Sequence, residues 1–278
     1  MTEIKPFTEL LKKSFQRANK SWPKLSGVLL IISAFFAAYA LALFILSFWI
    51  QGALLRGMPL RTEHILEFLV LLVGIYALLR WNGAIAYAFA VSTTDEFAGE
   101  PIFRVAKKSW KNGIGFFINS FNTGMLILFG QTLAICPCFL MQSNFIFSPY
   151  LYVYEGLKNR AARKRARELT KGFGWVVLQR SSIFLLIGYL VIAIIFLSIF
   201  APHPIIFITI ALLLAMYASS IQSHFLREIY LESKEHHAAA HDSPPKRTWI
   251  ISSTVVAVIV IIVYYSIKFG LHLVSLRN

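Results

Sequence analysis

The sequence predicts an all-α fold, a polytopic bundle of about seven transmembrane helices. Of the 278 residues, 57% are hydrophobic and only 14% are charged, whereas soluble globular domains carry roughly 25% charged residues. Charged groups are costly in hydrocarbon, so a chain that crosses a bilayer many times carries few of them. The apolar residues also gather in long segments, each near the length of about 20 residues that a helix needs to cross.

Seven segments meet that length. The fourth is the weakest, because it contains two prolines together with Gln142 and Asn144. The fifth and sixth are separated by Pro202-His203-Pro204, as expected where prolines end a helix. The predicted spans are residues 25–50, 65–92, 114–134, 135–155, 176–200, 205–226 and 249–268.

The distribution of basic residues orients these spans, because Lys and Arg concentrate on the cytoplasmic side of membrane proteins. If the fourth segment crosses, one side holds six, four, seven and four of the 27 Lys and Arg residues, in segments 1–24, 93–113, 156–175 and 227–248. The other side holds only Arg56, Arg61, Lys268 and Arg277. We therefore expect a cytoplasmic N-terminus and an external C-terminus.

This orientation divides the chain into four parts. Residues 1–24 are predicted to form a cytoplasmic amphipathic helix, and residues 25–226 a six-span membrane domain. A cytoplasmic His-rich linker, 227–248, then leads to an additional span and short tail, 249–278.

The segment after Gly156 has the pattern of a basic amphipathic helix. At helical spacing its apolar residues form one stripe, and the opposite side carries Arg160, Arg163, Lys164, Arg167 and Lys171. Such helices lie in the membrane interface, where they attract anionic lipid headgroups. Two further copies begin near Phe7 and Pro101. One interpretation is a topology determinant and surface anchor, and the other is specific headgroup binding. We expect no nucleic-acid binding, because the cations are dispersed over four loops.

Two charged residues stand out near or inside the spans. Arg80 lies near the middle of the second span, where an ionisable residue suggests function, and Gln142 and Asn144 fall at similar depth. Arg80 is either a structural link between helices, or snorkels, or handles an anion or lipid. Glu155 ends the fourth span and is expected to form a structural ion pair with Lys158 or Arg180.

Catalytic and metal-binding patterns are missing from the sequence. It contains no Walker A loop, H-E-x-x-H, G-x-S-x-G or Rossmann fingerprint. His237 and His241 have a metal-binding spacing, but they lie in a segment that reads as a solvated linker. Cys136 and Cys138 are expected to be free thiols, since a disulfide between them would be strained. We therefore expect neither enzymatic activity, nor a bound metal, nor a cofactor.

One stretch resembles a known family. It has Pro149-Tyr150, Glu155-Gly156, Ala162, Ala166-Arg167-Glu168-Leu169 and Lys171-Gly172 followed by Trp175. This resembles a bacterial family of polytopic membrane proteins that includes the membrane domain of some glycerophosphoryl diester phosphodiesterases. The resemblance covers about residues 95–235 and implies an all-helical inner-membrane protein. It carries over no catalytic residue, because the hydrolase activity of fused members belongs to a separate soluble domain.

These observations predict a non-enzymatic integral membrane protein that organises lipid or a partner protein at the inner leaflet. Its expected partners are membrane lipids with anionic headgroups and a membrane protein. The alternative is a transporter or channel for a small anionic or amphiphilic solute. Its polar interior would consist of Arg80, Asn122, Gln142, Asn144 and Gln222.

Overall fold

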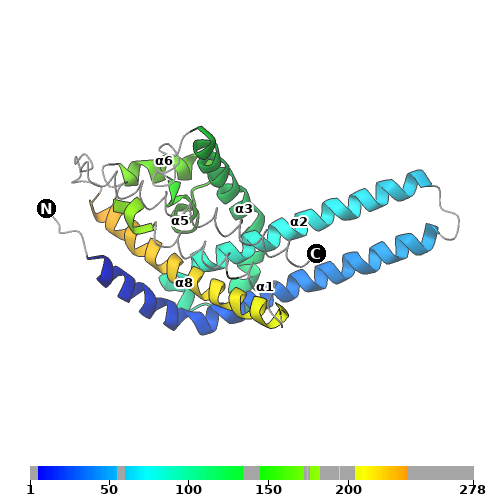
Figure 1. Ribbon diagram of the computed structural model, residues 1–278, viewed down its shortest axis with the longest axis horizontal. Helices are drawn as coiled ribbons and strands as arrows, with labels where there is room; N and C mark the ends of the chain where they lie inside the picture. Colours follow the sequence, from blue (N-terminus) through cyan, green and yellow to red (C-terminus); the bar gives the residue numbers. More distant parts are fainter. Residues whose placement is uncertain are drawn as a thin grey trace, which may run out of the picture.

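The computed structural model describes residues 6–54, 60–133, 145–171, 174, 176–181, 194 and 204–236. Every regular element among them is helical, which confirms the predicted all-α class (Figure 1). The elements are α1 (Phe7–Leu54), α2 (Leu60–Ser92), the short 3-10 helix η1 (Asp95–Ala98), α3 (Ile102–Leu133), α5 (Ser148–Tyr154), α6 (Asn159–Thr170) and α8 (Pro204–His236).

Three helices are long and apolar enough to cross a membrane: Phe7–Gln51, Ile65–Ser92 and Ile205–Glu235. They correspond to the first, second and sixth predicted spans. α3 contains the predicted third span but is not one of these three. The fourth predicted span is described only from residue 145 to residue 155, and the fifth lies largely outside the described residues. Residues 249–268, Cys136 and Cys138 lie wholly outside them.

α1 is a single helix of 48 residues, although two elements were expected on either side of residue 24. Pro23 lies inside it, and a proline removes one hydrogen-bond donor without necessarily ending a helix. At 1.5 Å per residue α1 is about 70 Å long, more than twice the roughly 30 Å hydrocarbon core. A large part of α1 therefore extends beyond the length needed to cross.

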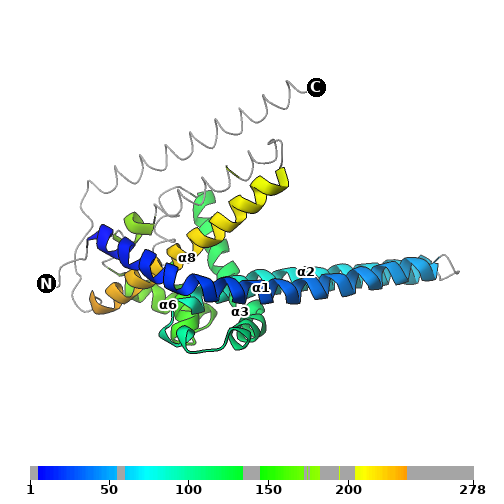
Figure 2. The same cartoon turned by 90° about the horizontal axis from the view of Figure 1, so that it is seen from below.

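The second half of α1 and the first half of α2 form a long hairpin that projects away from the other helices (Figures 1 and 2). Large apolar side chains cover its outside. They include Leu41, Phe44, Phe48, Trp49, Ile65 and Phe68, all exposed. Such a surface suits lipid, where apolar side chains need no protein partner.

Where α2 meets α3 the two backbones touch. A Cβ atom on Gly83 would lie 1.9 Å from the carbonyl oxygen of Gly113, and one on Gly113 would lie 2.5 Å from the carbonyl oxygen of Arg80. Only glycine fits at both positions, and small residues are what allow membrane helices to approach so closely. A core of apolar residues from α1, α2 and α3 surrounds this contact, with Val28, Ile32, Ala84, Ala88 and Val105 fully buried.

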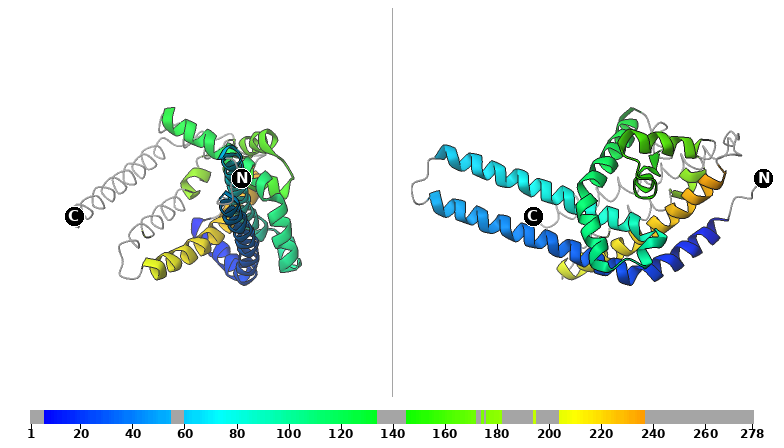
Figure 3. Two further views of the ribbon diagram at one scale, coloured as in Figure 1. Left: turned by 90° about the vertical axis from the view of Figure 1, so that its right-hand side faces the viewer. Right: turned by 180° about the vertical axis from the view of Figure 1, so that it is seen from behind.

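A second core lies at the opposite end of the molecule from the hairpin (Figure 3). It joins the first half of α1 and the second half of α8 to α5 and α6. Its fully buried members include Leu10, Phe147, Leu151, Leu169, Phe225 and Ile229.

The turn from α5 to α6 depends on Gly156, whose φ of 66° lies in the left-handed region that favours glycine at a helix end. The Leu157 N–H donates to the carbonyl of Leu151 at 3.2 Å, which closes the turn. α6 then packs back onto the second core with Ala162, Ala166 and Leu169 buried. Three residues of the apolar stripe expected to enter the bilayer surface are thus covered by protein, whereas Ala161 is exposed and Phe173 lies outside the described residues.

Candidate functional site

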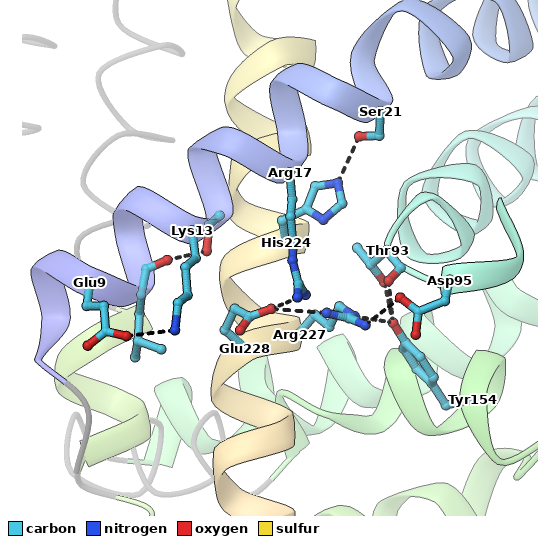
Figure 4. Close-up of polar contacts among 12 residues, drawn as sticks. Glu9, Lys13, Arg17, Ser21, Thr93, Asp95, Tyr154, His224, Arg227 and Glu228 are labelled. Carbon is cyan, nitrogen blue, oxygen red and sulfur yellow. Dashed lines mark hydrogen bonds and ion pairs between the residues drawn. The ribbon is translucent and has the colours of Figure 1, made fainter. Parts of the chain in front are cut away.

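Arg227 on α8 is the centre of a polar network between helix ends (Figure 4). Its side chain is only 7% exposed. The guanidinium donates to Glu228 at 3.1 Å, to Asp95 at 3.0 Å and to the Tyr154 hydroxyl at 3.2 Å. Three elements, α8, η1 and α5, therefore meet at a single buried cation, in keeping with the rule that buried charges are paired.

The network continues to α1 and to the end of α2. Arg17 donates to Glu228, so this carboxylate pairs with two arginines. The Tyr154 hydroxyl donates to the carbonyl of Thr93 at 2.9 Å. These contacts hold the first half of α1 and the last turn of α2 against α8 and α5.

His224 lies one turn before Arg227 on α8 and is 3% exposed. Its Nε2 atom is 2.9 Å from the hydroxyl of Ser21 on α1. Its other ring nitrogen, Nδ1, is buried and has no hydrogen-bond partner within the described part of the chain. Buried polar atoms nearly always have a partner, so one without any needs an explanation.

A cavity of about 380 Å³ opens beside this network. Four cations line it together with one carboxylate, Asp95, and it also contains the hydroxyls of the α2 end and of Ser21. Lys24 donates to the carbonyls of Phe97 and, at 3.0 Å, Ala98. Lys20 is exposed and forms no ion pair with any described residue. The cationic residues are Arg17, Lys20, Lys24 and Arg227.

Arg80, the site residue predicted inside the second span, contacts α3. Its Nε donates to the carbonyl of Trp110 at 2.9 Å, and its guanidinium carbon lies 5.2 Å from the centre of the Trp110 ring. The geometry matches the structural link between helices that the sequence left open. Asn122 is exposed on α3, while Gln142 and Asn144 lie outside the described residues.

Glu155 forms ion pairs, but with partners other than Lys158 or Arg180. It lies 3.8 Å from Arg165 and 3.9 Å from Lys234, and it accepts a hydrogen bond from Tyr230 at 2.8 Å. Arg180 instead pairs with Glu232 on α8. The expectation rested on the closeness of Lys158 in sequence and of Arg180 in membrane depth. The packing of α6 and α8 instead brings Arg165 and Lys234 close to Glu155.

The basic residues of α6 form a surface of their own. Four of the five predicted binding residues are exposed, and none of these four forms an ion pair with a described residue: Arg160, Lys164, Arg167 and Lys171. Arg163 is partly buried. Figure 1 shows α6 at the opposite edge of the molecule from α1, so this surface and the cavity are separate.

Sequence reasoning missed the network around Arg227. The sequence did contain a signal for this network, because Arg17, Asp95 and Arg227 all lie close to the ends of spans predicted on the same side of the membrane. Those charges indicated the topology, but no sequence pattern showed which of them contact one another. Across the described residues no group of His, Cys, Asp and Glu could hold a metal ion, and His237 and His241 lie outside them.

No family model, curated protein or solved structure matches this chain.

Proposed function

We propose that this chain is a multi-pass, non-enzymatic membrane protein that holds anionic lipid headgroups at the cytoplasmic face of a bacterial inner membrane. The observation that carries the proposal is the arrangement of α6. Its residues Ala162, Ala166 and Leu169 are buried against the protein. Three cations on its other side and Lys171, directly after its last residue, are exposed without an ion pair among the described residues.

A fixed basic helix attracts anionic lipid without entering the bilayer. Each Lys or Arg near an anionic membrane surface contributes about 1 kcal/mol. Because burial of Leu169 and its neighbours fixes α6 to the core, little ordering of the helix is needed when lipid binds, and such preorganisation favours affinity.

The topology belongs to the same proposal: seven spans, a cytoplasmic N-terminus and an external C-terminus. It is supported by the meeting of Arg17, Asp95 and Arg227, which belong to three segments expected on one side. The resemblance to the bacterial membrane-protein family implies only an all-helical inner-membrane protein. The transporter alternative gains nothing from the geometry, because Arg80 contacts the α3 backbone and Asn122 is exposed.

The test is lipid enrichment around the full chain in nanodiscs of phosphatidylcholine and phosphatidylglycerol, measured by native mass spectrometry of the retained lipids. The variant replaces Arg160, Lys164, Arg167 and Lys171 by Gln. The matched control replaces Arg56, Arg61, Lys268 and Arg277, which removes the same charge from the side predicted to be external.

We expect the α6 variant to lose phosphatidylglycerol enrichment and the control to keep it. Equal loss in both would overturn the role of α6 and the predicted sidedness. No enrichment around the unmodified chain would overturn the proposal itself. If a protein co-purifies in stoichiometric amount with the unmodified chain and is lost only from the α6 variant, the ligand of α6 is a protein partner and not lipid.

A further inference from the structure

The cavity beside Arg227 is not part of the α6 surface, and its residues form a site of a different kind. We infer that it binds a phosphate group, carried either by a lipid headgroup or by a small soluble phosphate. The inference rests on the proposed function only in placing the cavity at the cytoplasmic interface.

Charge is the first argument. The cavity is lined by Arg17, Lys20, Lys24 and Arg227, against the single carboxylate of Asp95. Asp95 is bound by Arg227 at 3.0 Å. Even after Glu228 is counted against the two arginines, the two lysines leave an excess of positive charge. A site with that excess attracts an anion.

Free donors are the second argument. A guanidinium has five N–H groups and an ammonium three. Arg17 uses one guanidinium nitrogen on Glu228, and Lys20 has no ion pair within the described ranges. Both therefore keep donors for phosphate oxygens. Arg227, by contrast, donates from each of its three nitrogens, to Glu228, Asp95 and Tyr154, and serves to fix the cavity wall.

His224 supplies the third argument, and it is independent of the surface charges. It lines the cavity, is 3% exposed, and its Nδ1 has no partner among described residues. When Nε2 accepts from the Ser21 hydroxyl, Nδ1 carries the proton and is a buried donor without a partner among those residues. Nδ1 has almost no accessible surface, so a phosphate oxygen reaches it only when the side chains around it move. Figure 4 shows the His224 ring beside Arg17, on the same side of α8 as the rest of the network.

Position and size agree with this ligand. The cavity lies at the ends of the predicted spans 25–50, 65–92 and 205–226, where apolar residues give way to polar ones, and the proposed topology places headgroup phosphates at this depth. Its volume of about 380 Å³ falls in the lower part of the range of roughly 300–1,000 Å³ seen for small-ligand pockets.

Two arms of one experiment separate the two sources of phosphate. In the first, the full chain in lipid-free maltoside detergent is titrated with inorganic phosphate, and binding is followed by calorimetry. In the second, the chain in nanodiscs of phosphatidylcholine and phosphatidylglycerol is extracted, and retained phosphatidylglycerol is counted by native mass spectrometry.

The variant is Lys20→Gln, because Lys20 is exposed and holds no other element in place. The control is Lys12→Gln, an exposed lysine two turns away on the same helix that lines a separate groove. We expect Lys20→Gln to weaken binding about fivefold and Lys12→Gln to leave it unchanged. Arg17→Gln should weaken it further, with size-exclusion chromatography confirming that this variant stays folded.

Binding in the first arm assigns the site to a soluble phosphate, and binding in the second alone assigns it to a headgroup. The inference is overturned if neither arm shows binding, or if both lysine variants behave alike. Loss of lipid from the α6 variant with no effect of Lys20→Gln would remove this site and leave the proposed function standing. Binding of inorganic phosphate that depends on Lys20, without any lipid enrichment around the chain, would support this site and overturn the proposed function.

Discussion

The hairpin of α1 and α2 and the core at the other end of the molecule differ in which side chains they expose and which they bury. The hairpin exposes Phe44, Phe48 and Trp49, and none of its residues whose side chains are described is a buried charge. The other end buries Arg227, Glu228 and Glu232 and pairs each of them. In lipid an exposed apolar side chain needs no partner, whereas a buried charge always does. Tertiary packing therefore matters most where the chain is most polar.

The largest expected effect comes from breaking a buried pair. Glu232 is 1% exposed and pairs with Arg180. Glu232→Gln removes the negative charge from this buried pair, and breaking such a pair typically costs about 3–5 kcal/mol of unfolding free energy. Unfolding of the purified protein in mixed micelles with increasing denaturing detergent measures it.

The matched control for that variant is Glu9→Gln. Glu9 is 45% exposed and pairs with Lys13 at 2.6 Å, and exposed pairs are worth about 0–1 kcal/mol. A loss for Glu9→Gln as large as that for Glu232→Gln would show that burial does not decide the contribution.

The next largest effect is expected when a large apolar side chain is replaced by alanine, and its size should differ between the two regions. Leu169 on α6 is 1% exposed, and Leu169→Ala should lower the unfolding free energy by about 2–5 kcal/mol, as in other cores. Phe48 on the hairpin is 72% exposed, and Phe48→Ala should change it by no more than about 0.5 kcal/mol. The same unfolding assay applies. Little change for Leu169→Ala would mean that α6 is not held on the core but lies free at the membrane surface.

A smaller effect is expected where α2 contacts α3. Gly83→Ala forces a Cβ to within 1.9 Å of the Gly113 carbonyl oxygen, and overpacking of this kind costs about 1–3 kcal/mol. Gly74→Ala is the control, because among the described residues its Cβ would meet only Leu43, at an ordinary 3.8 Å. Replacing that glycine should stabilise the helix by about 0.4–1 kcal/mol. Thermal unfolding, followed by circular dichroism, distinguishes the loss of stability expected for Gly83→Ala from the gain expected for Gly74→Ala.

The smallest effect concerns Arg80. Arg80→Leu removes the hydrogen bond to Trp110 and the contact with its ring. Such bonds in membrane proteins average about 0.6 kcal/mol, and cation–π contacts contribute about 0.5–1 kcal/mol at exposed sites. A structural role therefore predicts reduced yield of folded protein with unchanged lipid enrichment. Full yield with altered enrichment would instead point to an anion-handling role.

The sequence by itself determined the helical class and the membrane character of the chain. Both follow from local composition, since about 20 consecutive apolar residues suffice to mark a span. It also placed the second span at residues 65–92, where the structure has Ile65–Ser92. The periodicity of residues 157–173 correctly grouped Ala162, Ala166 and Leu169 on one side of a helix.

What covers that side was decided only by the tertiary structure, because periodicity is the same for a helix that faces lipid and one that faces protein. The same holds for the cavity. Arg227 and Asp95 are 132 residues apart in the chain, and no local rule pairs two charges at that separation. Only the packing of α1, α2, α5 and α8 brings their ends together, and the buried charge of Arg227 then takes its partners from η1, α5 and α8.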